Sequence, residues 1–168
     1  MKEQGHKGPN LIIVPTSVLP NWEREAQKFV PDMTRLVIYG ARRENLFKKI
    51  ESSELIITTY ALLRRDLDEL MKFEFNAIIL DEAQNIKNPN TITARSVRKM
   101  QARFRLCLSG TPIENTLLEL WSLFEFLMPG FLGSQASFQK GFVKPIKDGD
   151  DDSLGYLKAR VKPFILRR

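Results

Sequence analysis

The segment that decides the fold is Ala77-Ile78-Ile79-Leu80-Asp81-Glu82-Ala83-Gln84. Its uninterrupted apolar run is of strand length and predicts a strand that is buried on both faces of a parallel sheet. The adjacent carboxylates Asp81 and Glu82 follow at the carboxyl end of that strand, where ligands bind in open parallel sheets. One carboxylate there can hold Mg²⁺ through its water shell, and a second can orient an attacking water. An ordinary helix N-terminus, which acidic residues also stabilise, is the alternative that this segment alone leaves open.

Similar apolar runs recur on both sides of this strand, at Leu11–Val14, Arg35–Tyr39, Leu55–Thr59 and Phe104–Leu108. The stretches between them have helical spacing, as in Trp22, Ala26 and Phe29, and again across Leu63–Met71 and Ile92–Met100. Strand–helix alternation of this kind predicts an α/β fold with a doubly wound parallel sheet. Trp22 lies on the apolar stripe of its helix, which favours a core position over a base-stacking platform.

The alternation of predicted strands and helices ends after Leu108. Thr116 and Glu119 form a capping-box pattern before an apolar helix that Pro129-Gly130 ends. Residues 130–146 give no clear pattern, and residues 148–152 (DGDDD) predict a solvated loop whose spacing is not that of a calcium-binding EF-hand. A last helix is expected over Leu154–Lys162.

Composition excludes several classes of protein. A chain of 168 residues with 43% hydrophobic residues suits one globular domain or one lobe of a larger protein, and excludes wholesale disorder. The single cysteine and single histidine exclude an internal disulfide, a Cys/His zinc site and a Ser-His-Asp triad within this chain. No apolar run approaches the ~20 residues that a membrane helix needs, so we expect no membrane partner.

The net charge of +6 suits a polyanionic partner, although it also suits plain solubility. A basic cluster in the second half of the chain leaves the same two alternatives open, a nucleic-acid patch or a solvated helix face; it consists of Arg95, Arg98, Lys99, Arg103 and Arg105.

A second chemical segment follows the last predicted strand. Ser109-Gly110-Thr111-Pro112 places small hydroxyl residues and a glycine at that strand's carboxyl end, where the backbone can turn tightly beside a ligand. A plain strand-to-helix turn would need the same residue types. Because Asp81-Glu82 stands at the end of the preceding predicted strand, the pair of segments favours a shared ligand site.

Together these segments resemble the Swi/Snf branch of superfamily-two helicase-like ATPases, which are DNA translocases and chromatin remodellers. Asp81-Glu82-Ala83-Gln84 is similar to the Walker B motif, and Ile86-Lys87-Asn88 is typical of this branch. Leu108–Pro112 with Glu114-Asn115 resembles motif III. The remaining similar blocks are Ile13–Ser17 with Asn21-Trp22 and Glu25 (motif Ia), Ile57–Tyr60 (motif Ib), Gly141–Ile146 and Pro163–Arg168.

The resemblance implies a three-layer RecA-like lobe with a mainly parallel sheet and a helical C-terminal extension, divided here into residues 1–128 and 129–168. It implies that Asp81 acts on the Mg²⁺ of MgATP and that Glu82 polarises the hydrolytic water. Gln84, Ser109, Gly110 and Thr111 would couple the nucleotide state to the DNA-facing surface. Thr16, Ser17, Thr58 and Thr59 would bind the phosphates of double-stranded DNA, although simple capping or turn formation is open for each hydroxyl.

One part of the family's site is not in the printed sequence. The phosphate-binding pattern G-x-x-x-x-G-K-[ST] is absent, since none of the nine glycines is followed by lysine. We therefore expect a fragment that lacks the P-loop strand and helix and the second RecA-like lobe, does not hydrolyse ATP alone and binds no cofactor tightly. The missing strand would leave the edge at Phe104–Leu108 unpaired, which predicts self-association.

The function expected from the resemblance is ATP-dependent movement along double-stranded DNA by an intracellular protein, in the cytoplasm or nucleoid of a bacterium or the nucleus of a eukaryote. The alternative is a nucleotide-independent module that binds nucleic acid or protein and has kept only the fold. The intact Asp81-Glu82 pair favours the first.

Overall fold

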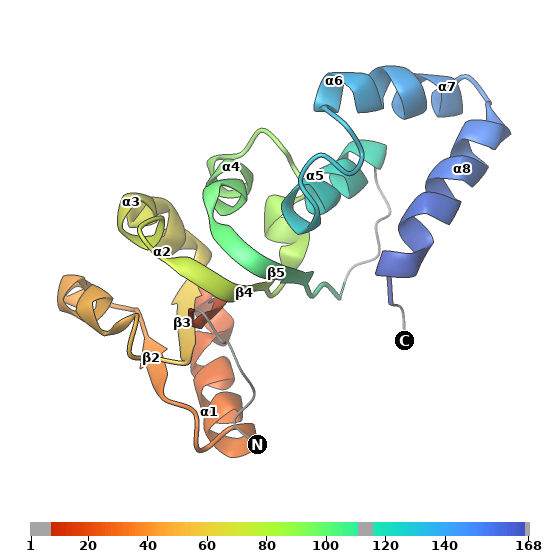
Figure 1. The fold of residues 1–168 in the computed structure, drawn as a ribbon. Coiled ribbons are helices and arrows are strands. Elements are labelled where there is room, and N and C mark those ends of the chain that lie inside the picture. Colours follow the sequence, from red (N-terminus) through yellow and green to blue (C-terminus); the bar gives the residue numbers. More distant parts are fainter. Residues whose placement is uncertain (1–7, 111–115, 167–168) are drawn as a thin grey trace.

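A computed structural model of the chain describes residues 8–110 and 116–166. Its centre is a five-stranded sheet in which every neighbouring pair is parallel, with the strand order β2-β3-β1-β4-β5 (Figure 1). The strands are β1 (Asn10–Val14), β2 (Arg35–Val37), β3 (Leu55–Thr59), β4 (Glu74–Leu80) and β5 (Gln101–Cys107). The α/β fold with a parallel sheet, predicted from the apolar runs, is therefore confirmed.

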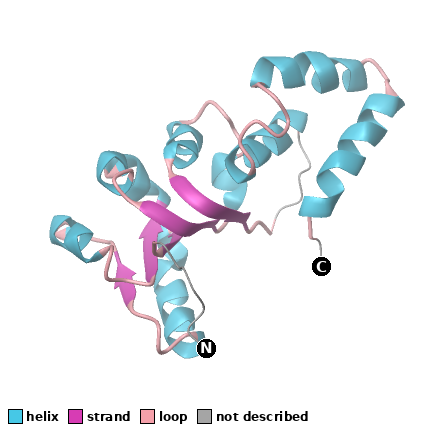
Figure 2. Cartoon of the chain, viewed as in Figure 1, coloured by secondary structure: helices cyan, strands magenta, loops and turns pink. Residues whose placement is uncertain are grey.

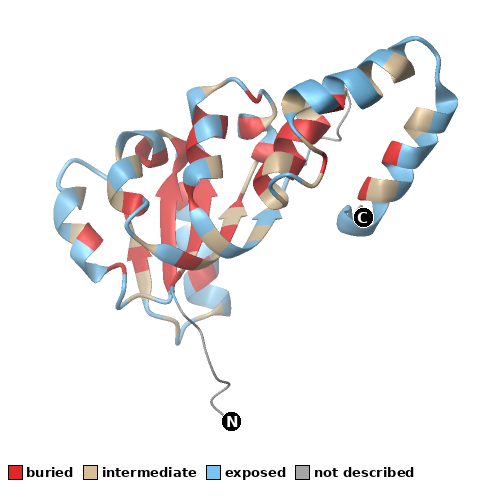
Figure 3. Ribbon diagram, turned by 45° about the horizontal axis from the view of Figure 1, so that its top comes forward, coloured by how far each residue is buried: buried red, intermediate tan, exposed pale blue. Residues whose placement is uncertain are grey.

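The middle strand β1 shows why these runs have almost no polar residues. Ile12 of β1 lies opposite Ile57 of β3 on one side and Ile79 of β4 on the other. Every residue of β3 is buried, as is β1 from Leu11 to Val14 (Figure 3). A strand with neighbours on both edges and helices on both faces has no position that water reaches, so alternation is lost.

Helices cover the two faces of the sheet unequally. On one face, α1 (Leu19–Phe29) packs with its preceding turn η1 (Thr16–Val18), and Leu19 and Ala26 join Ile12, Val14, Leu55 and Ile57 in a buried cluster. The other face carries η2 (Arg43–Lys49), α2 (Tyr60–Arg65), α3 (Leu67–Leu70), α4 (Ile92–Lys99) and α5 (Leu117–Leu127) over the larger core cluster. Figure 2 shows the helices on either side of the strands.

Two predicted elements differ from the observed ones. The strand expected over Arg35–Tyr39 is shorter and ends at Val37, although the Ile38 amide still donates to Ile57 O. The helical spacing over Leu63–Met71 is split at Asp66, whose backbone leaves the helix between α2 and α3. Arg43 donates to both Asp66 carboxylate oxygens, at 2.5 and 2.7 Å, and this long-range ion pair holds the carboxylate at the break.

The apolar helix α5 connects two cores. Leu123 and Phe126 belong to the cluster above the sheet, whereas Leu120, Trp121 and Phe124 belong to a second cluster with the C-terminal helices. Those elements are α6 (Gln135–Phe138), the π-helical turn η4 (Gln139–Val143), α7 (Lys144–Lys147), α8 (Asp151–Val161) and η5 (Lys162–Phe164). The division of the chain at residue 129 stays a prediction.

The loop predicted at residues 148–152 is partly wrong. Asp150 is the N-cap of α8, because its carboxylate accepts hydrogen bonds from the Ser153 amide and hydroxyl, and Asp151 and Asp152 form the first turn. The backbone bond from Ser153 holds the pKa of Asp150 below its usual value. An acidic run at a helix N-terminus is stabilised by the helix dipole, so the helix begins earlier than its apolar residues suggest.

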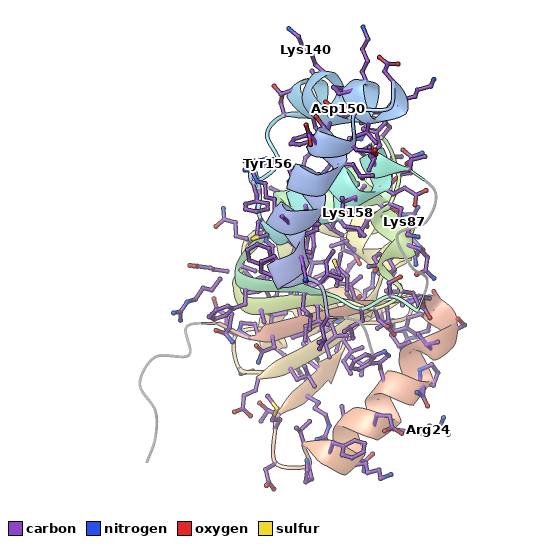
Figure 4. All side chains as sticks on the ribbon, turned by 90° about the vertical axis from the view of Figure 1, so that its right-hand side faces the viewer. Arg24, Lys87, Lys140, Asp150, Tyr156 and Lys158 are labelled. Atoms are coloured by element: carbon purple, nitrogen blue, oxygen red, sulfur yellow. The ribbon has the colours of Figure 1, made fainter. Side chains whose placement is uncertain are left out.

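Charged side chains cover the C-terminal helices on their outer side. Lys140 projects away from the top of this part of the molecule, and Tyr156 and Lys158 lie along α8 (Figure 4). Within residues 8–110 and 116–166, no helix is long and apolar enough to cross a membrane.

Candidate functional site

Asp81 and Glu82 stand at the carboxyl end of β4, as expected from their place after the apolar run. Four hydrogen bonds fix Asp81. Its amide donates to Ile13 O at 2.9 Å, and its carbonyl accepts from the Tyr60 hydroxyl at 2.8 Å. Its Oδ1 accepts from the Glu82 amide at 3.0 Å, and its Oδ2 accepts from Trp22 Nε1 at 2.6 Å. The carboxylate is therefore held in one orientation at the strand end.

Trp22 and Tyr60 were not assigned to the site from the sequence. Trp22 is partly buried against the cluster under α1, which agrees with the core position expected from its helical spacing, but its indole N–H also reaches Asp81. Burial raises the pKa of Tyr60, and the nearby Cys107, Asp81 and Glu82 raise it further. The phenol therefore stays protonated and donates to Asp81. The spacing of residues along the sequence does not predict either of these two long-range contacts with Asp81.

Glu82 has a left-handed backbone, with φ 50° and ψ 56°, and among the described residues no other non-glycine has a positive φ. Such a conformation costs about 1–2 kcal/mol for a residue with a Cβ atom. Residues held in this way are concentrated at active sites, where the surrounding contacts enforce the strain. The turn places η3 (Ala83–Ile86) directly after the two carboxylates.

A chain of side-chain hydrogen bonds connects the ends of β4 and β5. Gln84 Nε2 donates to Glu82 Oε2 at 2.8 Å, and Ser109 Oγ donates to Gln84 Oε1 at 3.3 Å. The structure thus brings together Glu82, Gln84 and Ser109, which the sequence placed at two separate strand ends. Gly110 is exposed beside them, and Thr111 lies outside the described residues.

The backbone holds these two strand ends in register. The Leu108 amide donates to Leu80 O and the Ala83 amide donates to Leu108 O, both at 2.8 Å, so pairing continues past the last residues of β4 and β5. Cys107 lies just before this point, and burial raises the pKa of its thiol to about 12. The thiol is therefore neutral near pH 7 and is not a nucleophile.

The four predicted phosphate-binding hydroxyls fall into two pairs. Thr16 and Ser17 are exposed in η1, directly before α1. Thr58 and Thr59 are buried, with 0% and 1% of their surfaces exposed. The Thr58 hydroxyl donates to Ile38 O at 3.0 Å, and the Thr59 hydroxyl caps α2 by accepting from the Leu62 amide. The assignment of the buried pair as DNA ligands stays a prediction, and the observed bonds give both residues an internal role.

The basic cluster of the second half of the chain is not one surface. Arg98 donates to Ala94 O and Pro89 O, and Arg105 donates to Phe126 O and Met100 O, at distances from 2.5 to 3.0 Å. Burial lowers the pKa of both guanidinium groups. These two arginines donate to backbone carbonyls of the same or neighbouring segments, which neither a nucleic-acid patch nor a solvated face describes.

The surface hollows lie away from the strand ends. The larger, of about 510 Å³, is lined by residues of η2, α2 and α3 around Asp66. The smaller, of about 260 Å³, lies between residues 87–90 and the start of α5. In it, Glu119 Oε2 is 3.6 Å from Lys87 Nζ. Neither hollow is lined by Asp81 or Glu82, which lie at an open strand end that forms no enclosed cavity.

The two carboxylates fit a magnesium ion that is bound together with a nucleotide. Mg²⁺ in such sites takes one or two carboxylates and completes its octahedron with water and phosphate oxygens. Asp81 and Glu82 provide that donor set at a strand end. No group of three or more His, Cys, Asp or Glu residues that could form an all-protein cage exists among residues 8–110 and 116–166.

Comparison with protein families gives a match to the model of the SNF2-related domain over residues 1–168. The chain is 46% identical to the Bacillus subtilis protein YwqA, named as an ATP-dependent helicase/translocase, with 100% of this chain and 19% of YwqA covered. It is 38% identical to the TATA-binding protein-associated factor mot1 of Schizosaccharomyces pombe, over 95% of this chain and 9% of that protein. The chain thus spans about a fifth or less of these relatives.

Solved structures with the same fold include the SWI2/SNF2 ATPase core of Sulfolobus solfataricus in complex with double-stranded DNA. It is 45% identical and superposes with a TM-score of 0.89 over 98% of this chain and 34% of that chain. The SWI2/SNF2 ATPase core domain of Sulfolobus solfataricus, also 45% identical, superposes with a TM-score of 0.84 over 97% of this chain and 33% of that chain.

Proposed function

The chain belongs to the SNF2-related domain family, and from that premise we propose that it is the lobe of an ATP-driven double-stranded-DNA translocase that carries the hydrolytic carboxylates. The observation that carries the proposal is the strained Asp81-Glu82 turn, hydrogen-bonded through Gln84 to Ser109 at the neighbouring strand end. A binding module that does not hydrolyse ATP has no need to hold a glutamate in a left-handed conformation.

In this proposal Asp81 would hold Mg²⁺ through its water shell, and the bound ion would supply charge neutralisation at the ATP phosphates. Glu82 orients and polarises the attacking water. Its side chain is held by Gln84 Nε2, so the amide fixes where the carboxylate oxygens point. Gln84, Ser109, Gly110 and Thr111 then form the connection between the nucleotide and the rest of the lobe.

The proposed contact with DNA is to its phosphates, without reading of bases. Thr16 and Ser17 suit it because their exposed hydroxyls and the amides of a helical start donate hydrogen bonds to phosphate oxygens. Thr58 and Thr59 are buried and bonded to Ile38 O and the Leu62 amide, so a part of theirs in this contact would be indirect. A protein with this function acts in the cell compartment that holds DNA.

The second RecA-like lobe is a proposed partner, because arginines that complete such a site come from it. We also propose that the chain alone does not turn over ATP, since its sequence has no phosphate-binding loop pattern. DNA-stimulated hydrolysis by the purified 168-residue chain would contradict this.

The decisive experiment is Glu82→Gln in a longer protein that contains this chain and hydrolyses ATP. Loss of the carboxylate is expected to reduce kcat by about 100- to 10,000-fold, the usual contribution of a positioned base. ATP binding should persist, because the proposed role of Glu82 is to orient the attacking water and not to bind the phosphates. Glu23→Gln, an exposed carboxylate on α1, is the matched control and should leave kcat unchanged. Turnover that survives Glu82→Gln would overturn the proposal.

Self-association is a further proposal. β5 is an edge of the sheet, and Phe104, Leu106 and Leu108 expose 62%, 48% and 37% of their surfaces. An edge strand with exposed apolar side chains can pair with another copy of the same chain. Light scattering that gives a monomer at all concentrations would contradict this.

A further inference from the structure

The contact between Trp22 and Asp81 joins α1 to the carboxylate that the proposed function assigns to Mg²⁺. The distance of 2.6 Å from Nε1 to Oδ2 is short, as expected when the acceptor is ionised. The indole ring packs against the cluster that α1 forms with the face of the sheet that it covers. Packing therefore fixes the ring, and the ring fixes where its N–H points.

Among residues 8–110 and 116–166, the indole N–H is the one hydrogen-bond donor to the Asp81 carboxylate that comes from a different element. The other carboxylate oxygen accepts from the amide of the next residue, Glu82, and moves with the same turn. The backbone of Asp81 is anchored independently, by Ile13 O and the Tyr60 hydroxyl. Loss of the indole N–H would leave the strand in place and free the carboxylate to rotate.

The helix that carries Trp22 begins at the exposed hydroxyls. η1 contains Thr16 and Ser17 and continues without a break into α1, whose fourth residue is Trp22. Six residues of helix span about 9 Å, which is less than two turns. A displacement of η1 would therefore also displace the indole ring. Arg24, on the same helix, lies on its outer side and points away from the sheet (Figure 4).

We propose that Trp22 is a positioning residue for Asp81, through which α1 sets the orientation of the metal-binding carboxylate. The inference rests on the proposed function for the identity of the metal, but the hydrogen bond itself is tested without any turnover. The residue acts through Asp81 and takes no part in the chemical step.

The first measurement is the indole N–H resonance of Trp22 in ¹⁵N–¹H NMR spectra of the chain. Asp81→Ala removes the acceptor, so the Trp22 indole proton should move upfield and exchange faster with water. Trp121 is the internal control, because its Nε1 donates to Gly133 O at 2.9 Å, away from the site. Mg²⁺ added without nucleotide should shift the Trp22 resonance and leave that of Trp121. A Trp22 resonance unmoved by Asp81→Ala overturns the inference.

The second measurement is the Mg²⁺ dependence of ATP hydrolysis by a longer protein that contains this chain. Trp22→Phe keeps the apolar ring and removes the N–H; we expect the Mg²⁺ concentration for half-maximal rate to rise roughly 3- to 10-fold, within the usual net contribution of one intramolecular hydrogen bond. The rate at saturating Mg²⁺ should change less, whereas a structural defect would lower that rate as well. Trp121→Phe removes the same donor elsewhere and should leave the Mg²⁺ requirement unchanged.

The outcomes separate this inference from the proposed function. If Glu82→Gln abolishes turnover but Trp22→Phe leaves the Mg²⁺ requirement unchanged, Trp22 only packs and the inference fails. If Glu82→Gln retains turnover, the proposed function fails, while the NMR result for Trp22 and Asp81 still decides the hydrogen bond. A poorly folded Trp22→Phe protein leaves the decision to the NMR comparison of the unmodified chain with Asp81→Ala.

Discussion

Thr58→Val separates the internal role of a hydroxyl from a role in DNA binding. Valine has the shape of threonine, so the substitution removes only the hydroxyl that donates to Ile38 O at 3.0 Å. Thr58 is completely buried, so water does not replace the lost partner. Leaving a buried acceptor without its donor costs about 1–3 kcal/mol. For a chain of this size that corresponds to a fall in Tm of roughly 2–12 °C.

The assay measures thermal unfolding and DNA affinity on the same proteins. Unfolding is followed by circular dichroism, and duplex DNA binding is titrated at one fixed salt concentration, because phosphate contacts are strongly salt-dependent. The matched control is the double variant Thr16→Val with Ser17→Ala, which removes the exposed hydroxyls of η1. Its stability should stay within about 0.5 kcal/mol of the unmodified chain, as for most surface substitutions, while its DNA affinity falls.

Thr58→Val should give the opposite result, with a lower Tm and an unchanged affinity for DNA wherever the protein is folded. A valine variant with unchanged Tm and weakened DNA binding would refute the reasoning, because the hydroxyl would then serve the ligand and not the fold.

Three further predictions concern β5. Cys107 should react with iodoacetamide far more slowly in the folded chain than in denaturant at pH 8, because a pKa raised to about 12 leaves about one thiol in ten thousand ionised; equal rates would contradict the burial. Arg105→Met should lower Tm by leaving Met100 O and Phe126 O without their guanidinium donor, which calorimetry can measure against Arg103→Met. Phe104→Lys with Leu106→Lys should shift light scattering toward the monomer, and unchanged association would exclude this edge.

The sheet could be predicted because its signal is local. A strand with neighbours on both edges and helices on both faces is apolar at nearly every position, and the runs Leu11–Val14 and Leu55–Ile57 have that property. Parallel strands also place their carboxyl ends at one edge. That rule is enough to bring Asp81 and Ser109 together without knowledge of any side-chain contact.

The features that the sequence did not predict depend on partners far along the chain. Asp66 breaks a helix whose apolar spacing continues, and the arginine that binds it comes from η2. Arg98 and Arg105 look like surface charges in a helical or strand pattern, yet they donate to backbone carbonyls 9 and 21 residues away along the chain. Trp22 has the spacing of a core residue, and nothing in that spacing indicates that its N–H reaches Asp81.

The strain at Glu82 and the bonds around it have a common explanation. A left-handed glutamate is kept only if neighbouring contacts compensate its cost of about 1–2 kcal/mol. Here the Glu82 amide donates to Asp81 Oδ1, its carboxylate accepts from Gln84, and the following amide, of Ala83, donates to Leu108 O. Each contact therefore both stabilises the turn and fixes one carboxylate relative to the other. Since the last of them comes from the end of β5, any displacement of that strand end changes the geometry of Glu82 directly. Ser109 is thus connected, through Gln84, to the same set of contacts that balances the strain at Glu82.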